Sequence, residues 1–280
     1  MPYDTAKAAL GEKLFFDTSL SADGSVSCNS CHDLRTSGTD NVESSVGVGG
    51  KKGQINSPTV YNSVFNFAQF WNGRAKDLRE QAKGPILNPI EMANTKEGAV
   101  ASLVKNKAYV AEFGKLYKDG ITFNNIADAI AEFEKTLITP DSKFDRYLRG
   151  DKSVLNAAEK QGYELFKDKG CISCHNGVNI GGNMFQKIGV VLEYKDPKKI
   201  SGRFEVSKKQ SDKDMFKVPT LRNIDLTSPY FHNGLVKDLD EAVRLMGRHQ
   251  LGIELRDGEV KKIVAYLKTL TGKKPMRYSK

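Results

Sequence analysis

Two five-residue motifs constrain this chain more than any other feature. Residues 28–32 and 171–175 both have the pattern C-x-x-C-H, and together they contain all four cysteines of the 280 residues. Cysteines at i and i+3 lie on one side of a helical turn, where they can form thioethers with the two vinyl groups of one haem, and the adjoining histidine then lies under the iron. The sequence therefore predicts two covalently attached c-type haems. The predicted attachment and proximal residues are Cys28, Cys31 and His32 for the first haem, and Cys171, Cys174 and His175 for the second.

Other chemistries of paired cysteines fit this pattern less well. A zinc site normally combines two ligand pairs at a fixed spacing, whereas these pairs lie in opposite halves of the chain and each has its own histidine. A redox-active C-x-x-C pair does not need that histidine. Zinc binding and disulfide chemistry stay open as the alternatives to haem attachment.

The composition is that of a globular protein without a membrane span. Hydrophobic residues make up 39% of the chain and charged residues 28%, and no run of 18 or more apolar residues occurs. The formal net charge of +9 comes from scattered lysines, and the haem propionates would offset roughly four charges, so we expect no nucleic-acid partner. Covalent haem attachment generally takes place outside the bacterial cytoplasm. We therefore expect a periplasmic protein whose export signal has been removed or replaced.

The chain contains an internal repeat, visible as short matching segments in the same order in both halves. The matching pairs are residues 11–15 and 162–166, 58–62 and 219–223, 70–73 and 231–234, and 130–137 and 263–270. Chance could produce one such match but hardly four in order. The sequence therefore indicates a duplicated haem domain.

Both closing segments of the repeat have helical periodicity, with apolar residues recurring every three or four positions. We expect each half to consist of an opening helix, a haem motif, loops and a closing amphipathic helix, with long loops over residues 181–217. The predicted fold class is mainly α, with two class I cytochrome c-like haem domains in tandem that are related by internal duplication. Because Pro140 cannot extend a helix, the predicted domains are 1–140 and 141–280, with the last residues packing back on the first domain.

Beyond these features, the chain resembles the bacterial di-haem cytochrome c peroxidases over nearly its full length. The segments that carry the resemblance are the two haem motifs and residues 14–17 (LFFD), 56–60 (NSPTV), 69–74 (QFWNGR), 81–85 (QAKGP), 91–92 (EM), 218–223 (VPTLRN), 229–232 (PYFH) and 246–252 (MGRHQLG). The resemblance implies an enzyme that reduces hydrogen peroxide to water with electrons from a small donor protein, a c-type cytochrome or a cupredoxin. It also implies a peroxide site at the amino-terminal haem, electron uptake at the high-potential carboxy-terminal haem, and a homodimer.

Met246 occupies the place of the family's methionine ligand to the second iron. A thioether opposite histidine fills the coordination sphere and raises the potential. Met92 is a competing ligand for the first iron, which would make both haems closed electron carriers. Glu91, next to it, matches the family's catalytic glutamate, which would move a proton between the two peroxide oxygens. The resemblance assigns Gln81 as a hydrogen-bonding residue of the same pocket, with Met92 as packing.

By the same resemblance, Trp71 lies between the haems and couples them, and His232, its repeat counterpart, hydrogen-bonds a haem propionate. The family also holds a calcium ion at the domain interface through an asparagine side chain and backbone carbonyls, hard oxygen ligands that suit calcium. The matching residues are Asn56, Thr227 and Pro229. We therefore expect two c-type haems and one calcium ion.

Two positions depart from the family's pattern. Many relatives have a histidine ten positions before the proline of the first Pro-Thr pair, where it caps the peroxide-site iron of the fully oxidised enzyme. The residue here is Val48, which cannot bind iron. Relatives often have aspartate after the tryptophan, whereas this chain has Asn72. We expect the first haem to be open, or readily opened, in the oxidised protein.

Two other functions stay open. If Met92 or another group closes the first iron, the protein is a di-haem electron-transfer cytochrome without peroxidase activity. Relatives that oxidise a protein side chain also resemble this chain, but they lack methionine at the second haem, so Met246 counts against that function.

Overall fold

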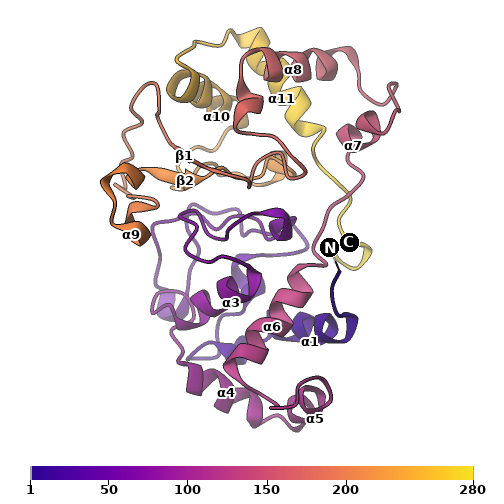
Figure 1. The fold of residues 1–280 in the computed structure, drawn as a ribbon, viewed down its shortest axis with the longest axis vertical. Coiled ribbons are helices and arrows are strands. Elements are labelled where there is room, and N and C mark those ends of the chain that lie inside the picture. Colours follow the sequence, from indigo (N-terminus) through magenta and orange to yellow (C-terminus); the bar gives the residue numbers. More distant parts are fainter. Residues whose placement is uncertain (1, 280) are drawn as a thin grey trace.

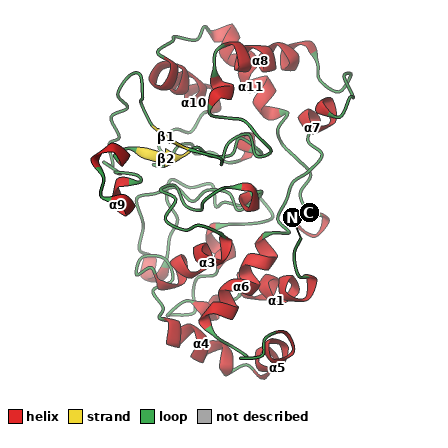
Figure 2. Cartoon of the chain, in the orientation of Figure 1, coloured by secondary structure: helices red, strands yellow, loops and turns green. Residues whose placement is uncertain are grey.

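The computed structural model describes residues 2–279 as two mainly helical lobes stacked one on the other (Figure 1). The first lobe contains α1 (Thr5–Phe16), α2 (Cys28–Cys31), α3 (Leu78–Leu87), α4 (Lys96–Val104), α5 (Lys107–Leu116) and α6 (Phe123–Glu134). The second contains α7 (Lys143–Leu148), α8 (Ala157–Asp168), α9 (Phe204–Ser207), α10 (Leu239–Met246) and α11 (Asp257–Lys268). Loops and turns form most of the junction between the lobes (Figure 2). The mainly α architecture in two tandem halves is as predicted.

Each lobe is built on a pair of packed helices, one from its start and one from its end. α1 packs against α6 in the first lobe, and α8 packs against α11 in the second. Both contacts are close because glycine lies at them. A Cβ atom on Gly11 would collide with the backbone carbonyl of Ala129, and a Cβ atom on Gly162 with that of Lys262. The opening and closing segments of the repeat therefore hold each lobe together.

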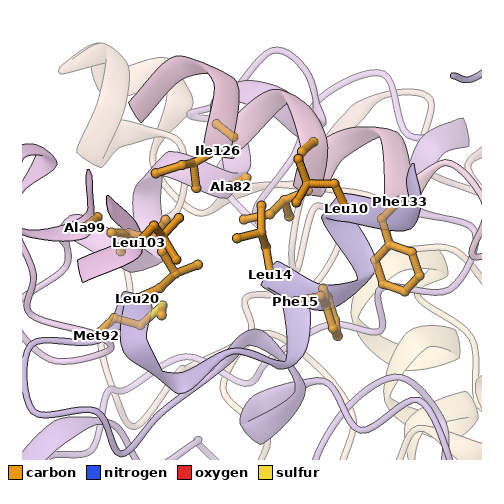
Figure 3. Packing of buried hydrophobic residues seen from close by; sticks show 14 of the residues in the cluster. Leu10, Leu14, Phe15, Leu20, Ala82, Met92, Ala99, Leu103, Ile126 and Phe133 are labelled. Atoms are coloured by element: carbon orange, nitrogen blue, oxygen red, sulfur yellow. The ribbon is translucent and has the colours of Figure 1, made fainter. Parts of the chain in front are cut away.

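The core of the first lobe lies between α1, α4 and α6. Its side chains include Leu10, Leu14, Leu103, Ile126 and Phe133 (Figure 3). Met92 belongs to this core, beside Leu20, and is only 2% exposed. Tyr278, near the end of the chain, also belongs to it, and its ring centroid lies 6.3 Å from that of Phe16 in α1. The carboxy-terminal segment thus returns to the first lobe.

The second lobe has its own core, formed by α8, α11 and the segments that flank them. Its largest side chains include Phe144, Phe166 and Tyr266. Among the helices of residues 2–279, none combines the length and apolarity needed to cross a bilayer.

A small antiparallel sheet lies at the junction of the lobes, within residues 181–217, where we expected only long loops. β1 (Phe185–Lys187) pairs with β2 (Met215–Lys217), and Gln186 lies opposite Phe216. Each strand is three residues long, which is too short for an alternating apolar pattern to be recognised in the sequence.

Two backbone hydrogen bonds, which are related to each other by the internal repeat, join the lobes. The N–H of Asn56 donates to the carbonyl of His232 (2.9 Å), and the N–H of Lys217 donates to the carbonyl of Trp71 (2.7 Å). Asn56 and Lys217 each lie two residues before a repeated proline, and Trp71 and His232 are repeat counterparts. Each lobe therefore offers the same donor and the same acceptor to the other, as in an approximate twofold relation.

Candidate functional site

One large cavity, of about 860 Å³, extends across the junction of the lobes and reaches both haem motifs. Its volume is near the upper end of the range for ligand cavities, about 300–1,000 Å³. The site residues predicted from the sequence all line it: Cys28, Cys31, His32, Asn56, Trp71, Gln81, Glu91, Cys171, Cys174, His175, Thr227, Pro229, His232 and Met246. Their individual roles remain predictions, but the fold brings the residues of both halves to one space.

Each pair of cysteines lies on one helical turn at the cavity wall. Cys28 and Cys31 bracket α2, and Cys171 begins a 3₁₀ turn that is followed directly by Cys174. All four thiols are free. Two thiols on one turn are what thioether attachment to a single haem requires.

The two motif histidines are poised to bind a metal. Burial lowers the pKa of His32, and it lowers the pKa of His175 to about 4, so both imidazoles are neutral near pH 7. The neutral ring is the form that binds metals. Nδ1 of His32 lies 3.3 Å from the carbonyl oxygen of Gly38, which leaves Nε2 for an iron. Nδ1 of His175 is buried without a hydrogen-bond partner in residues 2–279.

These residues fit one c-type haem in each lobe. Within residues 2–279, no group of three or more His, Cys, Asp or Glu side chains is arranged to hold a metal ion. That arrangement is what a zinc site would need. The zinc alternative therefore loses its support, while the thiol pairs and neutral histidines keep the geometry that haem attachment needs.

Met246 is the last residue of α10 and lines the cavity together with His175. The chain continues from Met246 into a π-helical turn, Gly247–Leu251, and such turns occur frequently at functional sites. The thioether is thus on the wall of the cavity that the second haem would occupy.

Glu91 is a partly buried residue whose carboxyl group accepts a hydrogen bond from a neighbouring side chain. Nδ2 of Asn88 donates a hydrogen bond to Oε1 of Glu91 at 2.7 Å. Burial raises the pKa of Glu91, while the charge of Arg74 and the Asn88 hydrogen bond act in the opposite direction. Gln81, on α3, lines the same cavity. Sequence reasoning missed Arg74 and Asn88 as partners of Glu91, although Arg74 ends the segment 69–74 that carries the family resemblance.

Val48 lies on the loop that covers the Glu91 segment. Its N–H donates to the carbonyl of Glu91 at 2.9 Å, and its side chain, 5% exposed, belongs to the core of the first lobe. The neighbouring Gly47 allows this close approach, because a Cβ atom there would collide with the carbonyl of Ile90. The loop is therefore fixed by packing and a backbone hydrogen bond.

Trp71 and His232 meet edge to face at the junction of the lobes, with ring centroids 6.3 Å apart. The indole Nε1 of Trp71 donates to the carbonyl of Asn56 at 2.9 Å. Nε2 of His232 lies 3.2 Å from Oδ2 of Asp196, and its ring stacks on Phe216 with centroids 4.0 Å apart. If His232 binds a propionate, as the resemblance implies, it must do so through Nδ1.

The predicted calcium ligands also lie at this junction. Nδ2 of Asn56 donates to the carbonyl of Val42 at 2.9 Å, which leaves its Oδ1 free of hydrogen bonds within residues 2–279. Nδ2 of Asn41 donates one hydrogen bond to the carbonyl of Leu226 and another to the carbonyl of Ser228, each at 2.8 Å. The carbonyls of Thr227 and Pro229 accept no hydrogen bond within the same range. Unpartnered oxygens of this kind suit a calcium ion.

Glu134, at the end of α6, is a further cavity residue that sequence reasoning missed. It is buried, and its Oε2 has no hydrogen-bond partner within residues 2–279. Its repeat counterpart is Leu267. A signal was therefore present in the sequence, because a carboxyl group stands where the other half has an apolar core residue.

Two family models match this chain. The model of the di-haem cytochrome c peroxidases matches residues 5–153, and a cytochrome c model matches residues 159–271.

Named relatives and a solved structure agree with these models. Cytochrome c551 peroxidase of Nitrosomonas europaea is 52% identical over 98% of this chain and 82% of its own length. Cytochrome c peroxidase Ccp of Escherichia coli is 50% identical over 97% of this chain, which spans 59% of that longer protein. A crystal structure of a MauG-like protein associated with microbial copper homeostasis superposes with a TM-score of 0.86 at 28% identity, covering 97% of this chain and 91% of that one.

Proposed function

This chain belongs to the di-haem cytochrome c peroxidase family, and we propose that its two lobes divide the reduction of hydrogen peroxide between them. It is a peroxidase with two covalently bound c-type haems, and hydrogen peroxide is its substrate. We assign the peroxide site to the first lobe and electron uptake to the second.

The observation that carries this assignment is the difference between the two lobes at their shared cavity. The first lobe contributes the carboxyl group of Glu91 and the amide of Gln81, and the second contributes the thioether of Met246. A thioether opposite histidine suits an electron-transfer haem, whereas a positioned carboxyl group suits proton transfer. When bound, the haems supply the redox centres that deliver two electrons to the peroxide.

Residues of the first lobe then transfer the protons. The overall reaction consumes one peroxide, two protons and two electrons and yields two waters. Because Oε1 of Glu91 accepts a hydrogen bond from Asn88, Oε2 is the oxygen that takes a proton from one peroxide oxygen and gives it to the other. The oxygen that receives this proton leaves as water. Gln81 orients the peroxide by hydrogen bonding within the same cavity.

The remaining assignments concern partners and placement. We assign one calcium ion to Asn56, Thr227 and Pro229. A small donor protein, a c-type cytochrome or a cupredoxin, docks on the second lobe, where apolar Ile172 of the haem motif is exposed. The protein works in the periplasm, because covalent haem attachment takes place outside the cytoplasm, and it forms a homodimer, as the family resemblance implies.

A steady-state assay tests the function directly. The holoprotein is mixed with hydrogen peroxide and a reduced small cytochrome c, and oxidation of the cytochrome is followed optically. We expect two cytochromes to be oxidised for each peroxide consumed. Rapid exchange of electrons with the cytochrome, but no peroxide consumption, would instead support the electron-transfer alternative.

A further inference from the structure

Lys217, the last residue of β2, is a buried cation without a partner. Its side chain lines the cavity and the residue is 6% exposed, yet its ammonium group makes no hydrogen bond or ion pair within residues 2–279. Burial lowers its pKa to about 8, and no neighbouring charge offsets that effect. Lysine is rarely so buried unless paired, because removing an isolated charge from water is unfavourable. The position therefore calls for an anion that the protein itself does not supply.

The place of Lys217 in the repeat indicates where that anion lies. Its N–H donates to the carbonyl of Trp71, just as the N–H of Asn56 donates to the carbonyl of His232. Asn56 and Lys217 are thus equivalent positions at the junction of the lobes. Asn56 carries a neutral amide, which we assign as a calcium ligand, and Lys217 carries an ammonium group. The approximate twofold relation therefore puts a charged side chain beside the second half of the cavity, at the position where the first half has an amide.

The cavity must accept two haems, and each haem brings two propionate carboxylates. The other strongly basic side chain on the cavity wall is Arg74, which lies over the Phe70 ring and acts on Glu91 in the first lobe. Lys217 belongs to the second lobe and follows Phe216, whose ring stacks on His232. A carboxylate of the second haem is the anion that fits this place.

We propose that Lys217 is the counter-cation of a propionate of the haem attached through Cys171 and Cys174. This inference rests on the presence of that haem but not on which lobe reduces peroxide. A fixed positive charge in a low-dielectric site favours the ferrous state, which carries one positive charge fewer than the ferric state. Lys217 therefore also raises the potential of the second haem above the value it would have without a charge at this position.

The test compares three variants of the holoprotein. Lys217→Met removes the charge and keeps the chain length, Lys217→Arg keeps the charge, and Lys213→Met removes an exposed lysine of the same segment. The midpoint potential of each haem is measured by optical redox titration, and the propionate bending band is measured by resonance Raman spectroscopy. We expect Lys217→Met to lower the potential of the second haem and shift its propionate band, while Lys217→Arg and Lys213→Met leave both near their original values.

Two results would overturn the proposal. The first is that Lys217→Met, with both haems attached, has the same propionate bending band as the unmodified protein. The charge of Lys217 would then act on the second haem from a distance or not at all, whether or not the midpoint potential changes. The other comes from the unmodified protein, which keeps the test valid if Lys217→Met does not fold. A propionate that is hydrogen-bonded to an ammonium group must shift its bending band in deuterium oxide, so a band that ignores deuterium would exclude the pairing.

Discussion

At the scale of single residues, two carboxyl groups on the wall of one cavity, the partly buried Glu91 and the buried Glu134, differ in what surrounds them. Glu91 has a hydrogen-bond donor in Asn88 and a positive charge nearby in Arg74. Among residues 2–279, no hydrogen-bond donor contacts Oε2 of Glu134, and burial raises the pKa of Glu134 to about 8. Glu91 is therefore oriented by a hydrogen bond and lies near a positive charge, whereas burial keeps Glu134 neutral below about pH 8 and no partner within residues 2–279 orients its Oε2.

Replacing Glu91 by Gln removes the proposed proton carrier and keeps the size of the side chain. General acid–base groups contribute about 10²–10⁴ in rate, so Glu91→Gln is expected to lose a factor of that size in kcat while both haems stay attached. Glu97→Gln, on the exposed surface of α4, is the matched control and should keep its activity. Near-normal turnover by Glu91→Gln would show that another group or water moves the proton.

Glu134 makes the free energy of unfolding depend on pH. Its folded-state pKa of about 8 lies above its ordinary value of 4.5, so between these pH values the folded state holds a proton that the unfolded state has released. The free energy of unfolding therefore decreases as pH rises through this window. We expect Glu134→Leu, which copies the repeat counterpart Leu267, to raise stability by several kcal/mol more above pH 8 than at pH 4.5, because a shift of one pKa unit corresponds to about 1.4 kcal/mol. Denaturant unfolding of the holoprotein at both pH values measures this, and an equal effect at both would exclude the titration of Glu134 as the cause.

At the scale of elements, the shape of the cavity depends on the helix pairs and on the loop at Val48, whose Gly47 lines it. α1 with α6, and α8 with α11, position the haem motifs that follow α1 and α8. The loop over residues 46–52 closes on itself through a bridge between Val46 and Lys52, and it is attached to the Glu91 segment through the Val48 N–H.

The close contact of α8 and α11 depends on Gly162. Gly162→Ala would place a methyl group against the carbonyl of Lys262, so the helices must separate. Overpacking of this kind costs about 1–3 kcal/mol. The expected result is a lower Tm for the second lobe. Gly258→Ala, in α11 with open space around the added Cβ atom, is the control and should leave Tm unchanged or raise it, and equal losses in both variants would argue against the contact as the cause.

We expect the loop at Val48 to determine the spin state of the first iron. With valine in place of the histidine that caps this iron in many relatives, we expect the fully oxidised protein to show high-spin haem, to bind cyanide, and to react with peroxide without prior reduction. A buried imidazole in the apolar core would be unfavourable, so in Val48→His the loop must turn and bring the imidazole out to the iron. This variant should therefore restore a low-spin iron and a requirement for reduction. Val46→His, at an exposed position of the same loop, should not do so. Purely low-spin spectra of the oxidised parent protein would point to Met92 or another closing ligand.

At the scale of the whole molecule, the two lobes meet through equivalent residues that carry different side chains. Each lobe makes the same backbone hydrogen bond to the other. The side chains at the equivalent positions differ, however: Asn56 corresponds to Lys217, and Trp71 to His232. One ancestral haem unit has thus been used twice, and the chemistry of the junction makes the two copies unequal.

Calcium removal tests the junction as a unit. If an ion links Asn56 to the carbonyls of Thr227 and Pro229, chelation with EGTA should slow peroxide turnover, because the ion bridges the two lobes that exchange electrons. Calcium should restore the rate, and magnesium should not, since magnesium demands a tighter octahedral site. Asn56→Ala should remove this response to added calcium. Turnover that is insensitive to EGTA, together with no calcium in the isolated protein by elemental analysis, would contradict the assignment.

Much of the fold and of the candidate site could be predicted from the sequence, because local patterns determine them. The C-x-x-C-H motifs specify attachment on one helical turn, the 3.6-residue periodicity specifies the closing helices, and the repeated Pro-Thr segments indicate the duplication. What escaped prediction depends on contacts between distant segments, as with Asn88 and Arg74 beside Glu91, and Asp196 beside His232. The three-residue strands β1 and β2 escaped because their pairing partner, and not their own pattern, defines them.

The sequence by itself determined the number and kind of haem sites, the helical class and the twofold origin of the chain, since each follows from residues close together in sequence. Only the tertiary structure decided what surrounds a side chain. A glutamate is catalytic or merely buried, and a lysine is a surface charge or a counter-cation, according to the groups that folding brings within a few ångströms of it. Burial and hydrogen-bond partners, which set pKa values and the cost of a charge, come from segments that are far apart along the chain.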